Sequence, residues 1–496
     1  MSIKKNYPFN FKNDFLASIV VFLVALPLCM GIAIASGVPP ILGLLSGIIG
    51  GIVIGAFSGS PLQVSGPAAG LAVMVFEFIN KFGLEALAPM GIVVGLSQLL
   101  VWKLRLAEYF KAISPALIKG LLSGIGLLIL ASQVHVAFDA NPVGSGIQNI
   151  VHIPNSFYKF VLQEGSGTAP MIIALVTLFS IILWQKFSGK IGKIIPGPLF
   201  AIILVTVASA VFNVELKFIT FSENLLNEMN FISMKSLSAV NMNLIVSAVA
   251  IAFVASAETL LSVAATDKLS GRGVSDYNKE IMAQGLGNML AGFLGALPIT
   301  GVIVRSSANV ESGGSSRWSA IFHGIWLFAL VFFFSNILSY VPVSALAGIL
   351  LFTGWKLLDA PSIPKLYKKN KSEALIYFVT FGLIVTVDLL TGVVAGFITS
   401  VFVLAHKLQS LEIEMIEHED EVRIHLKGNA SFLNVPKISE HLSNGQTDKK
   451  VTVCLKDLSY MDWAVEEQIN QWKDIHEKSG GEAEIRYSAP KEEVFS

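Results

Sequence analysis

Apolar segments long enough to cross a lipid bilayer follow one another along most of this chain. The first begins at Phe15 and the last ends near residue 407. A helix that crosses the hydrocarbon core needs roughly 20 mostly apolar residues, and fewer where it is broken in mid-membrane. The sequence therefore predicts a polytopic α-helical membrane domain with about 14 spans. They are expected near residues 15–36, 41–57, 66–80, 86–104, 115–134, 168–186, 197–213, 242–263, 278–296, 301–312, 317–338, 343–357, 373–388 and 391–407.

Charged residues divide the chain into two parts. They make up only 14% of it, against 53% hydrophobic residues, whereas soluble domains carry about 25% charged residues. This composition excludes a soluble enzyme, a disordered scaffold and a nucleic-acid binder that works by bulk positive charge. The net charge is zero, but residues 1–409 are basic, and residues 410–496, with 10 basic and 18 acidic residues, are acidic. We expect a transmembrane domain over 1–409 and a small soluble domain over 410–496.

Lysines and arginines between the predicted spans fall mostly on one side of the membrane. With alternating spans, the basic clusters at 103–105, 186–193 and 365–371 share the side of the N-terminus. The opposite side receives only Lys81, Lys159, Lys217 and Lys235. Because cytoplasmic loops carry the excess of basic residues, both termini are predicted to be cytoplasmic.

Two stretches in comparable places of the two halves are unusual for membrane helices. They are residues 58–70 (SGSPLQVSGPAAG) and residues 295–307 (GALPITGVIVRSS). Each contains a proline, a short extended piece and a small polar residue, Ser65 or Thr300, that opens a short helix. The order of the spans gives them opposite orientations. The sequence therefore predicts an inverted repeat with paired broken helices, a feature that marks mid-membrane substrate sites in transporters.

These two helix starts predict an anion site. A helix that begins in mid-membrane carries unpaired backbone N–H groups and the positive end of its dipole. Two such ends that face each other bind an anion with few charged side chains. Ser65, Gly66, Thr300 and Gly301 are small enough to expose this backbone. The alternative is that proline and glycine only kink packed helices.

Two charged residues are predicted at bilayer depth, where charges are rare and tend to be functional. Glu258 lies well inside a span, and Ser262 shares its helix face. Glu258 is expected to carry the coupling ion, a proton or, with Ser262, sodium; the alternative is a structural acid. Arg305 is expected close to the anion site, where it raises the positive potential or pairs with Glu258 or Glu311.

Two further acids lie near the ends of predicted spans. Asp388 is expected to cap or anchor a helix end, and Glu77 to be solvated at the outer end of the span 66–80. The alternative for Asp388 is a role in transport, whereas solvation at the surface accounts for Glu77.

The acidic tail alternates between strand-like and helix-like patterns. Residues 420–427, 451–455 and 483–487 read as strands, and residues 435–442 and 465–475 place apolar side chains at helical spacing. The tail is therefore predicted to be a small α/β domain. It carries no catalytic triad, P-loop or metal cluster, which favours a regulatory or assembly role.

Several motifs, in one order, resemble the sulfate permease (SulP) family of anion transporters, whose animal members form solute carrier family 26. The matching stretches are residues 24–40 (VALPLCMGIAIASGVPP), 64–69 (VSGPAA), 258–262 (ETLLS), 283–288 (AQGLGN), 298–301 (PITG) and 305–309 (RSSAN). The likeness covers essentially the whole chain, because the tail resembles the STAS domain that ends such proteins.

The resemblance implies a fold of seven plus seven inverted helices. In it a core domain (segments 1–4 and 8–11) moves against a gate domain (segments 5–7 and 12–14). It also implies a homodimer and transport by alternating access. Carried over to this sequence, the family's anion site comprises Leu28, Ile32, Ser65, Gly66, Ala68, Ala69, Thr300, Gly301, Val302, Val304 and Arg305, with ion coupling by Glu258 and Ser262.

Some of these positions depart from the family pattern. Leu28 stands where many members have a polar glutamine, and Val304 where some have a serine. Backbone N–H groups are therefore expected to do more of the anion binding. The pair Glu258 and Ser262 stands where a sodium-dependent bicarbonate transporter of the family has an aspartate and a threonine, which favours protons but leaves sodium open.

The sequence thus predicts a secondary transporter of sulfate or bicarbonate, coupled to a proton or sodium, without a cofactor, metal centre or nucleic-acid partner. A chloride or other anion exchanger and a non-transporting, anion-responsive sensor of the same fold stay open. A nucleobase permease would need polar side chains that read a base edge. An enzyme would need an activated nucleophile or a metal constellation, and the sequence offers neither.

Overall fold

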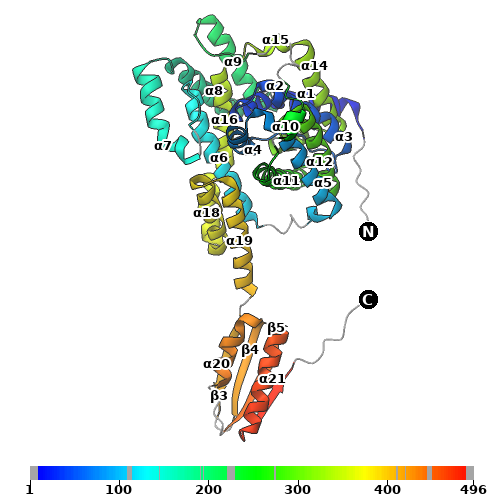
Figure 1. Ribbon diagram of the computed structural model, residues 1–496, viewed down its shortest axis with the longest axis vertical. Helices are drawn as coiled ribbons and strands as arrows, with labels where there is room; N and C mark the ends of the chain where they lie inside the picture. The colour runs from blue at the N-terminus through cyan, green and yellow to red at the C-terminus, as the bar shows by residue number, and fades with distance from the viewer. Residues whose placement is uncertain are drawn as a thin grey trace. The chain divides into compact units, whose positions relative to one another are not determined.

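The computed structural model forms two compact units, Met1–Gly396 and Phe397–Ser496, and each is considered by itself (Figure 1). The residues that the structure describes are 9–108, 114–143, 146–189, 191–193, 195–220, 229–238, 240–272, 275–408, 411–418, 421–443 and 449–487. The two chain ends, for which a cytoplasmic position is predicted, lie outside these residues.

In the described residues of the first unit, the regular structure is helical apart from two strands of three residues. Its helices are α1 (Phe11–Ala35), α2 (Pro40–Ile49), the π-helical turn η1 (Gly50–Ile54), α3 (Gly55–Phe57), α4 (Ala69–Phe82), α5 (Leu87–Lys103), α6 (Pro115–Ala137), α7 (Gly146–Ser156), α8 (Thr168–Phe187), α9 (Gly197–Val211), α10 (Met234–Ser238), α11 (Met242–Ser270), α12 (Tyr277–Leu294), α13 (Ile303–Glu311), α14 (Trp318–Phe333), α15 (Ser335–Leu338), α16 (Val343–Leu358), α17 (Ile363–Lys369), α18 (Lys371–Thr386) and α19 (Leu389–Leu408), which continues into the second unit. The strands are β1 (Ser65–Pro67) and β2 (Ile299–Gly301).

The helices form where the apolar segments predict them. Among the described residues, helices long and apolar enough to cross a membrane are Phe11–Ala35, Pro40–Phe57, Leu84–Lys103, Pro115–Ala137, Thr168–Phe187 and Met242–Ser270. Shorter apolar helices are Gly197–Val211, Trp318–Phe333, Val343–Leu358 and Leu389–Ala405. The predicted polytopic helical membrane domain is confirmed, whereas the number of fourteen spans stays a prediction. Helix α7 was not predicted.

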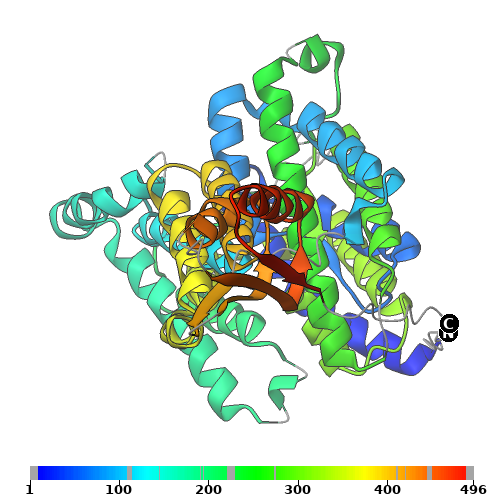
Figure 2. The same ribbon diagram turned by 90° about the horizontal axis from the view of Figure 1, so that it is seen from below.

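The helices of the first unit pack as two groups that lie side by side (Figures 1 and 2). In one group, called the core group, α5 packs on α12 and α11, and α1 packs on α2 and α14. In the other, called the gate group, α6 packs on α16 and α18, and α8 packs on α9 and α16. The two groups meet where α1 contacts α16 and where α4 contacts α6.

The two strands pair with each other inside the core group, and each leads into one of the broken helices. They pair antiparallel, with Ser65 opposite Gly301 and Pro67 opposite Ile299. Helix α4 begins directly after β1, and α13 begins directly after β2. Because Pro67 at the end of β1 lies opposite Ile299 at the start of β2, the two helices leave the strand pair at its opposite ends. The extended pieces and short helices predicted from the two unusual stretches are therefore present. The prediction that Ser65 and Thr300 open these helices is wrong, because both residues lie in the strands and the helices begin at Ala69 and Ile303.

A buried carboxylate holds the loop that leads into β1. Glu280 of α12 is fully buried. It accepts hydrogen bonds from Ser58 Oγ (2.6 Å), Gly59 N (2.9 Å), Ser60 N (3.1 Å), Gln63 Nε2 (3.2 Å) and Gln284 Nε2 (3.1 Å). Two turns along α12, Asn288 does the same for β2, since its amide accepts from Ile299 N–H (2.7 Å) and donates to Ile299 O (2.9 Å). One face of α12 therefore anchors both strands.

Replacing Glu280 with alanine is expected to destabilise the protein strongly. The change would leave several buried donors without an acceptor, and hydrogen bonds to a charged group are worth about 1.5–3 kcal/mol each. We expect the free energy of unfolding to fall by more than about 3 kcal/mol, measured by thermal unfolding of the detergent-solubilised protein. The control is Glu85→Ala, because Glu85 is an exposed acid paired with Lys235 (2.9 Å), and such pairs contribute about 0–1 kcal/mol. Equal melting temperatures for the two variants would contradict the role of Glu280.

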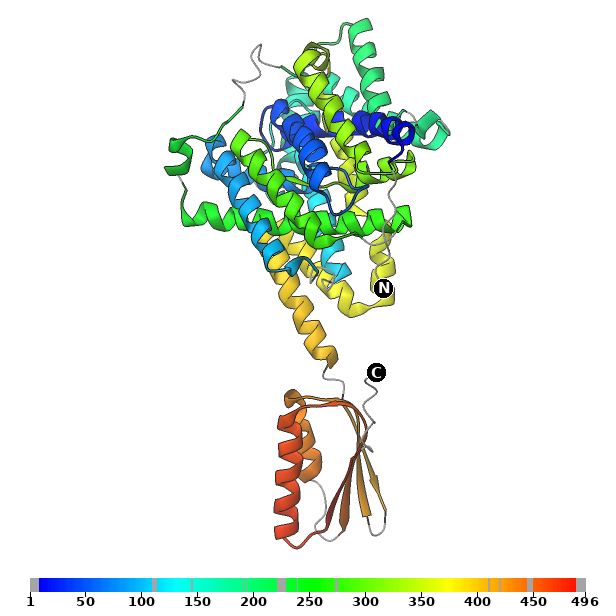
Figure 3. The same ribbon diagram turned by 90° about the vertical axis from the view of Figure 1, so that its right-hand side faces the viewer.

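The second unit is a four-stranded sheet with two helices on one face (Figure 3). Its elements are β3 (Leu411–Glu417), β4 (Glu421–Ala430), α20 (Val435–Ser443), β5 (Lys450–Met461), α21 (Trp463–Lys478) and β6 (Ala483–Arg486). Strand β3 is antiparallel to β4, whereas β4, β5 and β6 are parallel. The predicted small α/β domain is confirmed, with β3 as an additional strand. Its assignment as a STAS domain stays a prediction.

Candidate functional site

The starts of α4 and α13 meet at a small cavity between the core and gate groups. The cavity has a volume of about 80 Å³. Its core side is lined by Leu28, Ile32, Ala68, Ala69, Gly70, Glu258, Leu261, Val302, Ile303 and Val304. Its gate side is lined by Leu122, Thr353 and Leu357. Apart from Glu258 and Thr353, the lining side chains are apolar, so the polar groups available to a ligand here are mostly backbone ones.

Neither helix start at the cavity is capped by a side chain. Ala68 precedes α4 and Val302 precedes α13, and neither can accept a hydrogen bond with its side chain. Serine, threonine, asparagine or aspartate at these positions would occupy the first N–H groups of the helix. Here those N–H groups are left for a ligand, and the positive ends of two helix dipoles meet beside them. The arrangement suits a small anion.

The structure divides the predicted site residues into two sets. Those that line the cavity are Leu28, Ile32, Ala68, Ala69, Val302, Val304 and Glu258. Those that lie behind its wall are Ser65, Gly66, Ser262, Thr300, Gly301 and Arg305. The second set would act on a ligand through the backbone that it supports or through its charge, and not by direct contact.

The small residues of the second set build the strand pair. Ser65 Oγ accepts a hydrogen bond from Gln284 Nε2 (2.8 Å), and Gly301 N–H donates one to Thr259 Oγ1 (3.0 Å). A Cβ at Gly301 would collide with Gln63 Nε2. Glycine is therefore needed at position 301 for close packing, and these residues fix where the two helices begin.

Arg305 is fully buried behind β1. Its Nη2 lies 3.4 Å from both Cys29 Sγ and Pro67 O, whereas Nε and Nη1 have no hydrogen-bond partner among the described residues. A Cβ at Gly66 would collide with Nη1, so the guanidinium occupies the space that this glycine leaves. Within the described part of the chain, Arg305 forms no ion pair, with Glu258, with Glu311 or with any other acid. Its positive charge is thus uncompensated by side chains.

Glu258 packs on the first turn of α4. A Cβ at Gly70 would collide with its Oε1, and Thr300 lies within hydrogen-bonding reach of the carboxyl group. Its Oε2 and the hydroxyl of Ser262, one helical turn away, are buried and have no partner among the described residues. Buried polar atoms are normally satisfied. Two such oxygens on one face of α11 are suited to a proton or a small cation.

The residues that anchor the strands were not identified from the sequence. Glu280, Gln284 and Asn288 follow one another at intervals of four, so they form a polar stripe on one face of an otherwise apolar span. That spacing is a signal that could have been used, because buried polar groups in membrane spans tend to be functional. Among the described residues, no group of three or more His, Cys, Asp or Glu side chains could hold a metal ion.

The model of the sulfate permease family matches residues 11–380. The chain belongs to the sulfate permease family. This member is 31% identical over 393 residues to the putative sulfate transporter YvdB of Bacillus subtilis (strain 168). The aligned stretch covers 78% of this chain and 72% of that relative. It is accordingly a multi-pass membrane transport protein and not an enzyme.

Two solved structures show that this sulfate permease family member shares a known fold. The transmembrane domain of a cyanobacterium bicarbonate transporter, BicA, superposes with a TM-score of 0.68 at 23% identity, over 78% of this chain and 98% of that one. The overall structure of SLC26A9 superposes with a TM-score of 0.76 at 16% identity, over 96% of this chain and 85% of that one. The likeness to SLC26A9 therefore extends over both units of this chain.

Proposed function

We propose that this protein carries a small inorganic anion, sulfate or bicarbonate, across the membrane by alternating access, coupled to a proton or sodium ion. The observation that carries the proposal is the pair of uncapped helix starts, those of α4 and α13, at one apolar cavity beside Glu258. Relatives named as sulfate and bicarbonate transporters support the class of substrate.

In this proposal the anion is held by first-turn N–H groups of the two helices. Arg305 adds a positive potential from behind β1, where no acid in the described part of the chain forms an ion pair with it. Because this charge lies in a medium of low dielectric constant, its attraction for an anion is stronger than it would be in water. The apolar side chains of Leu28, Ile32 and Val304 line the cavity and exclude water from these contacts.

Coupling follows from the position of Glu258. An ionised carboxylate that lines the same cavity repels an anion, because like charges at close range disfavour each other. A proton or a sodium ion on Glu258 Oε2, with Ser262 Oγ as a second ligand for sodium, removes that repulsion. Each ion therefore favours the binding of the other, as symport requires.

We further infer a homodimer in a bacterial inner membrane with both termini in the cytoplasm. The excess of basic residues in the loops predicted on that side supports the orientation. Cross-linking in native membranes and accessibility of tags at the two chain ends would test these points.

The function is tested by uptake of labelled sulfate and labelled bicarbonate into proteoliposomes, with sodium and proton gradients imposed separately. Accumulation of one anion under one gradient would support the proposal and identify both ions. Uptake that needs a second anion on the opposite side, and no cation gradient, would identify an exchanger. No uptake of either anion under any gradient would overturn the proposal.

Replacing Glu258 with glutamine is expected to separate anion movement from the cation gradient. The amide keeps the size of the side chain but can neither take up the proton nor hold sodium as a carboxylate does. We expect cation-driven accumulation to fall at least tenfold, about 1.4 kcal/mol of coupling. Glu311→Gln is the control, since Glu311 is an exposed acid outside the cavity. Unchanged accumulation in Glu258→Gln would exclude the coupling role.

A further inference from the structure

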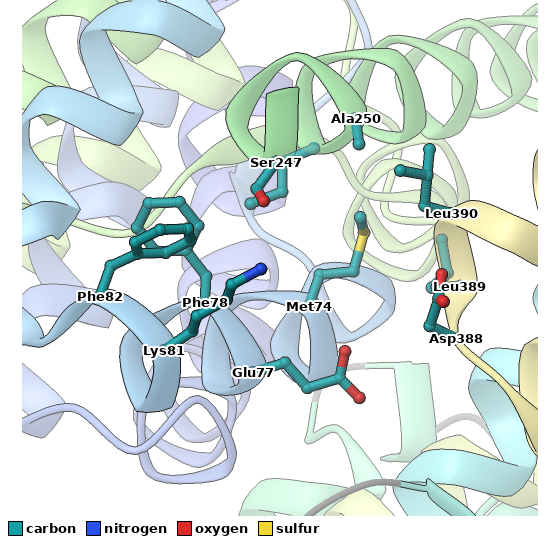
Figure 4. Close-up of a pocket in the computed structure, with 11 residues that line it drawn as sticks. Met74, Glu77, Phe78, Lys81, Phe82, Ser247, Ala250, Asp388, Leu389 and Leu390 are labelled. Carbon is teal, nitrogen blue, oxygen red and sulfur yellow. The ribbon is translucent and has the colours of Figure 1, made fainter. Parts of the chain in front are cut away.

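A second cavity of about 310 Å³ lies between the core group and the start of α19 (Figure 4). It is lined by Met74, Glu77, Phe78, Lys81 and Phe82 of α4, Ser247, Ala250 and Ile251 of α11, and Asp388, Leu389 and Leu390 at the start of α19. We call this cavity the vestibule. It lies at the end of α4 that is predicted to face the outside.

The vestibule and the candidate anion site open along the same two helix faces. On α4, Gly70 lines the site, and Met74, Glu77 and Lys81 line the vestibule at alternating intervals of four and three residues. This spacing keeps them on one side of the helix. On α11, Leu261 and Glu258 line the site, and Ile251 and Ser247 line the vestibule with the same spacing. The vestibule therefore lies farther along the same faces of α4 and α11 than the candidate site, toward the predicted outer side.

The vestibule carries three charged side chains, two acidic and one basic. Asp388 is fixed, because both of its oxygens accept hydrogen bonds from Thr391, from N–H and from Oγ1, each at 2.8 Å. This contact confirms the predicted helix cap. In Figure 4 the carboxyl group of Glu77 is turned to the side where Asp388 lies, and the ammonium group of Lys81 is turned toward Ser247. No ion pair joins these three residues within the part of the chain that the structure describes. Their sum is one negative charge.

We propose that Glu77 and Asp388, opposed by Lys81, make the vestibule a charge filter that favours univalent anions over divalent ones. The inference rests on the proposed function and deepens it, because it names the class of anion that reaches the site most easily. A net negative approach to an anion site repels every anion, but it repels a divalent anion twice as strongly. It also concentrates the coupling cation near the entrance.

The valence dependence gives the inference a quantitative signature. Electrostatic energy is proportional to the charge of the permeating ion, so the factor for a divalent anion is the square of the factor for a univalent one. Glu77 lies seven residues along α4 from Gly70, roughly 10 Å at 1.5 Å per residue. At that range, one charge removed from a water-filled cavity changes the concentration of a univalent anion about 2- to 3-fold, and of a divalent anion about 4- to 9-fold.

The first experiment measures the potential without using transport. A reporter thiol is placed in the vestibule by Ser247→Cys; the two native cysteines, Cys29 and Cys454, are buried. The full-length protein in liposomes is treated from outside with a cationic and an anionic methanethiosulfonate reagent, and the rates are normalised to those of a free thiol. We expect the cationic reagent to react faster. The ratio of rates should fall when Glu77→Gln is added and rise when Lys81→Gln is added.

The second experiment compares uptake of sulfate and bicarbonate at low ionic strength. Glu77→Gln is expected to lower KM for bicarbonate about 2- to 3-fold and KM for sulfate by the square of that factor, with kcat unchanged. Lys81→Gln is expected to raise KM for both anions, and the factor for sulfate should again be the square of the factor for bicarbonate. A high concentration of a salt whose ions are not transported should reduce these differences in KM between the variants and the unaltered protein, because the Debye length falls to about 3 Å at 1 M. Glu85→Gln is the matched control, an acid lost nearby but outside the vestibule.

The outcomes distinguish this inference from the proposed function. An unreactive Ser247→Cys thiol, or a rate ratio that does not respond to Glu77→Gln and Lys81→Gln, overturns the charge filter whatever the protein carries. A ratio that responds, together with equal KM changes for the two anions, overturns the selection by valence. Failure of the unaltered protein to take up either anion overturns the proposed function, and the reagent rates still decide whether the vestibule repels anions.

Discussion

Replacing Arg305 with methionine is expected to abolish efficient anion transport and to leave the protein at least as stable as before. The guanidinium is fully buried and has no ion pair among the described residues. A buried charge without a partner carries a desolvation penalty of several kcal/mol, which a side chain of similar length and no charge avoids. The positive potential at the helix starts disappears with the charge. At a few ångströms and an effective dielectric constant of about 20, this potential is worth roughly 2–3 kcal/mol, or about 30- to 150-fold in affinity for a univalent anion.

The Arg305 prediction is specific because transport is expected to fall while stability is expected to stay the same or rise. Anion affinity from uptake kinetics and the melting temperature in detergent are measured on the same preparation. Arg317→Met serves as the control, because Arg317 is only half-buried and bonds to the backbone oxygen of Ala56 away from the cavity. Arg305→Lys keeps the charge and should retain part of the transport. An Arg305→Met variant that melts well below the unaltered protein, or that transports normally, would show that the charge serves the fold and not the anion.

Gly70→Ala is expected to reduce coupled transport by at least tenfold in a protein that still folds. The added methyl group would overlap Oε1 of Glu258 and push the carboxyl group off the first turn of α4. Coupled transport would then suffer through the displaced Glu258 and through a narrower cavity, since Gly70 also lines it. Gly382→Ala in α18 is the control, because no heavy atom lies within 4 Å of a Cβ there and alanine favours a helix by about 1 kcal/mol.

A second substitution tests the cause of the Gly70 effect. Glu258→Asp shortens the acid by one methylene group and makes room for the methyl group of Gly70→Ala. The double variant is therefore expected to recover cation-driven uptake relative to Gly70→Ala alone, with a coupling energy of about 1 kcal/mol or more between the two positions. Simple addition of two losses would show that Gly70 and Glu258 act independently.

The broken helices could be predicted because their cause is local. Proline and glycine stand inside apolar segments at residues 58–70 and 295–307, and each disturbs helical backbone wherever it occurs. The position of Glu258 in mid-span followed equally from its neighbours in sequence. The small α/β domain was predicted because strands and helices differ in the period of their apolar residues.

The direction of a buried side chain could not be predicted in the same way. The helix that carries Arg305 was expected, but its guanidinium turns behind β1 because Gly66 leaves a space more than 200 positions earlier in the chain. Glu280 lies near the end of a predicted span, where an acidic side chain is usually solvated. Its burial becomes evident only from its hydrogen bonds to Ser58–Gln63, which are distant in sequence. Both features depend on contacts between distant segments, which one sequence does not reveal.

The pairing of β1 with β2 has a thermodynamic consequence. Hydrogen bonds between Ser65–Pro67 and Ile299–Gly301 make the two helix starts one rigid piece, so neither half can loosen its hold on an anion by itself. A carrier built in this way presents the same contacts to its cargo at both faces of the membrane. In the proposed transport cycle the intrinsic dissociation constant for the anion is then equal on the two sides, so the electrochemical gradients of the anion and of the coupled ion together set the direction of net transport.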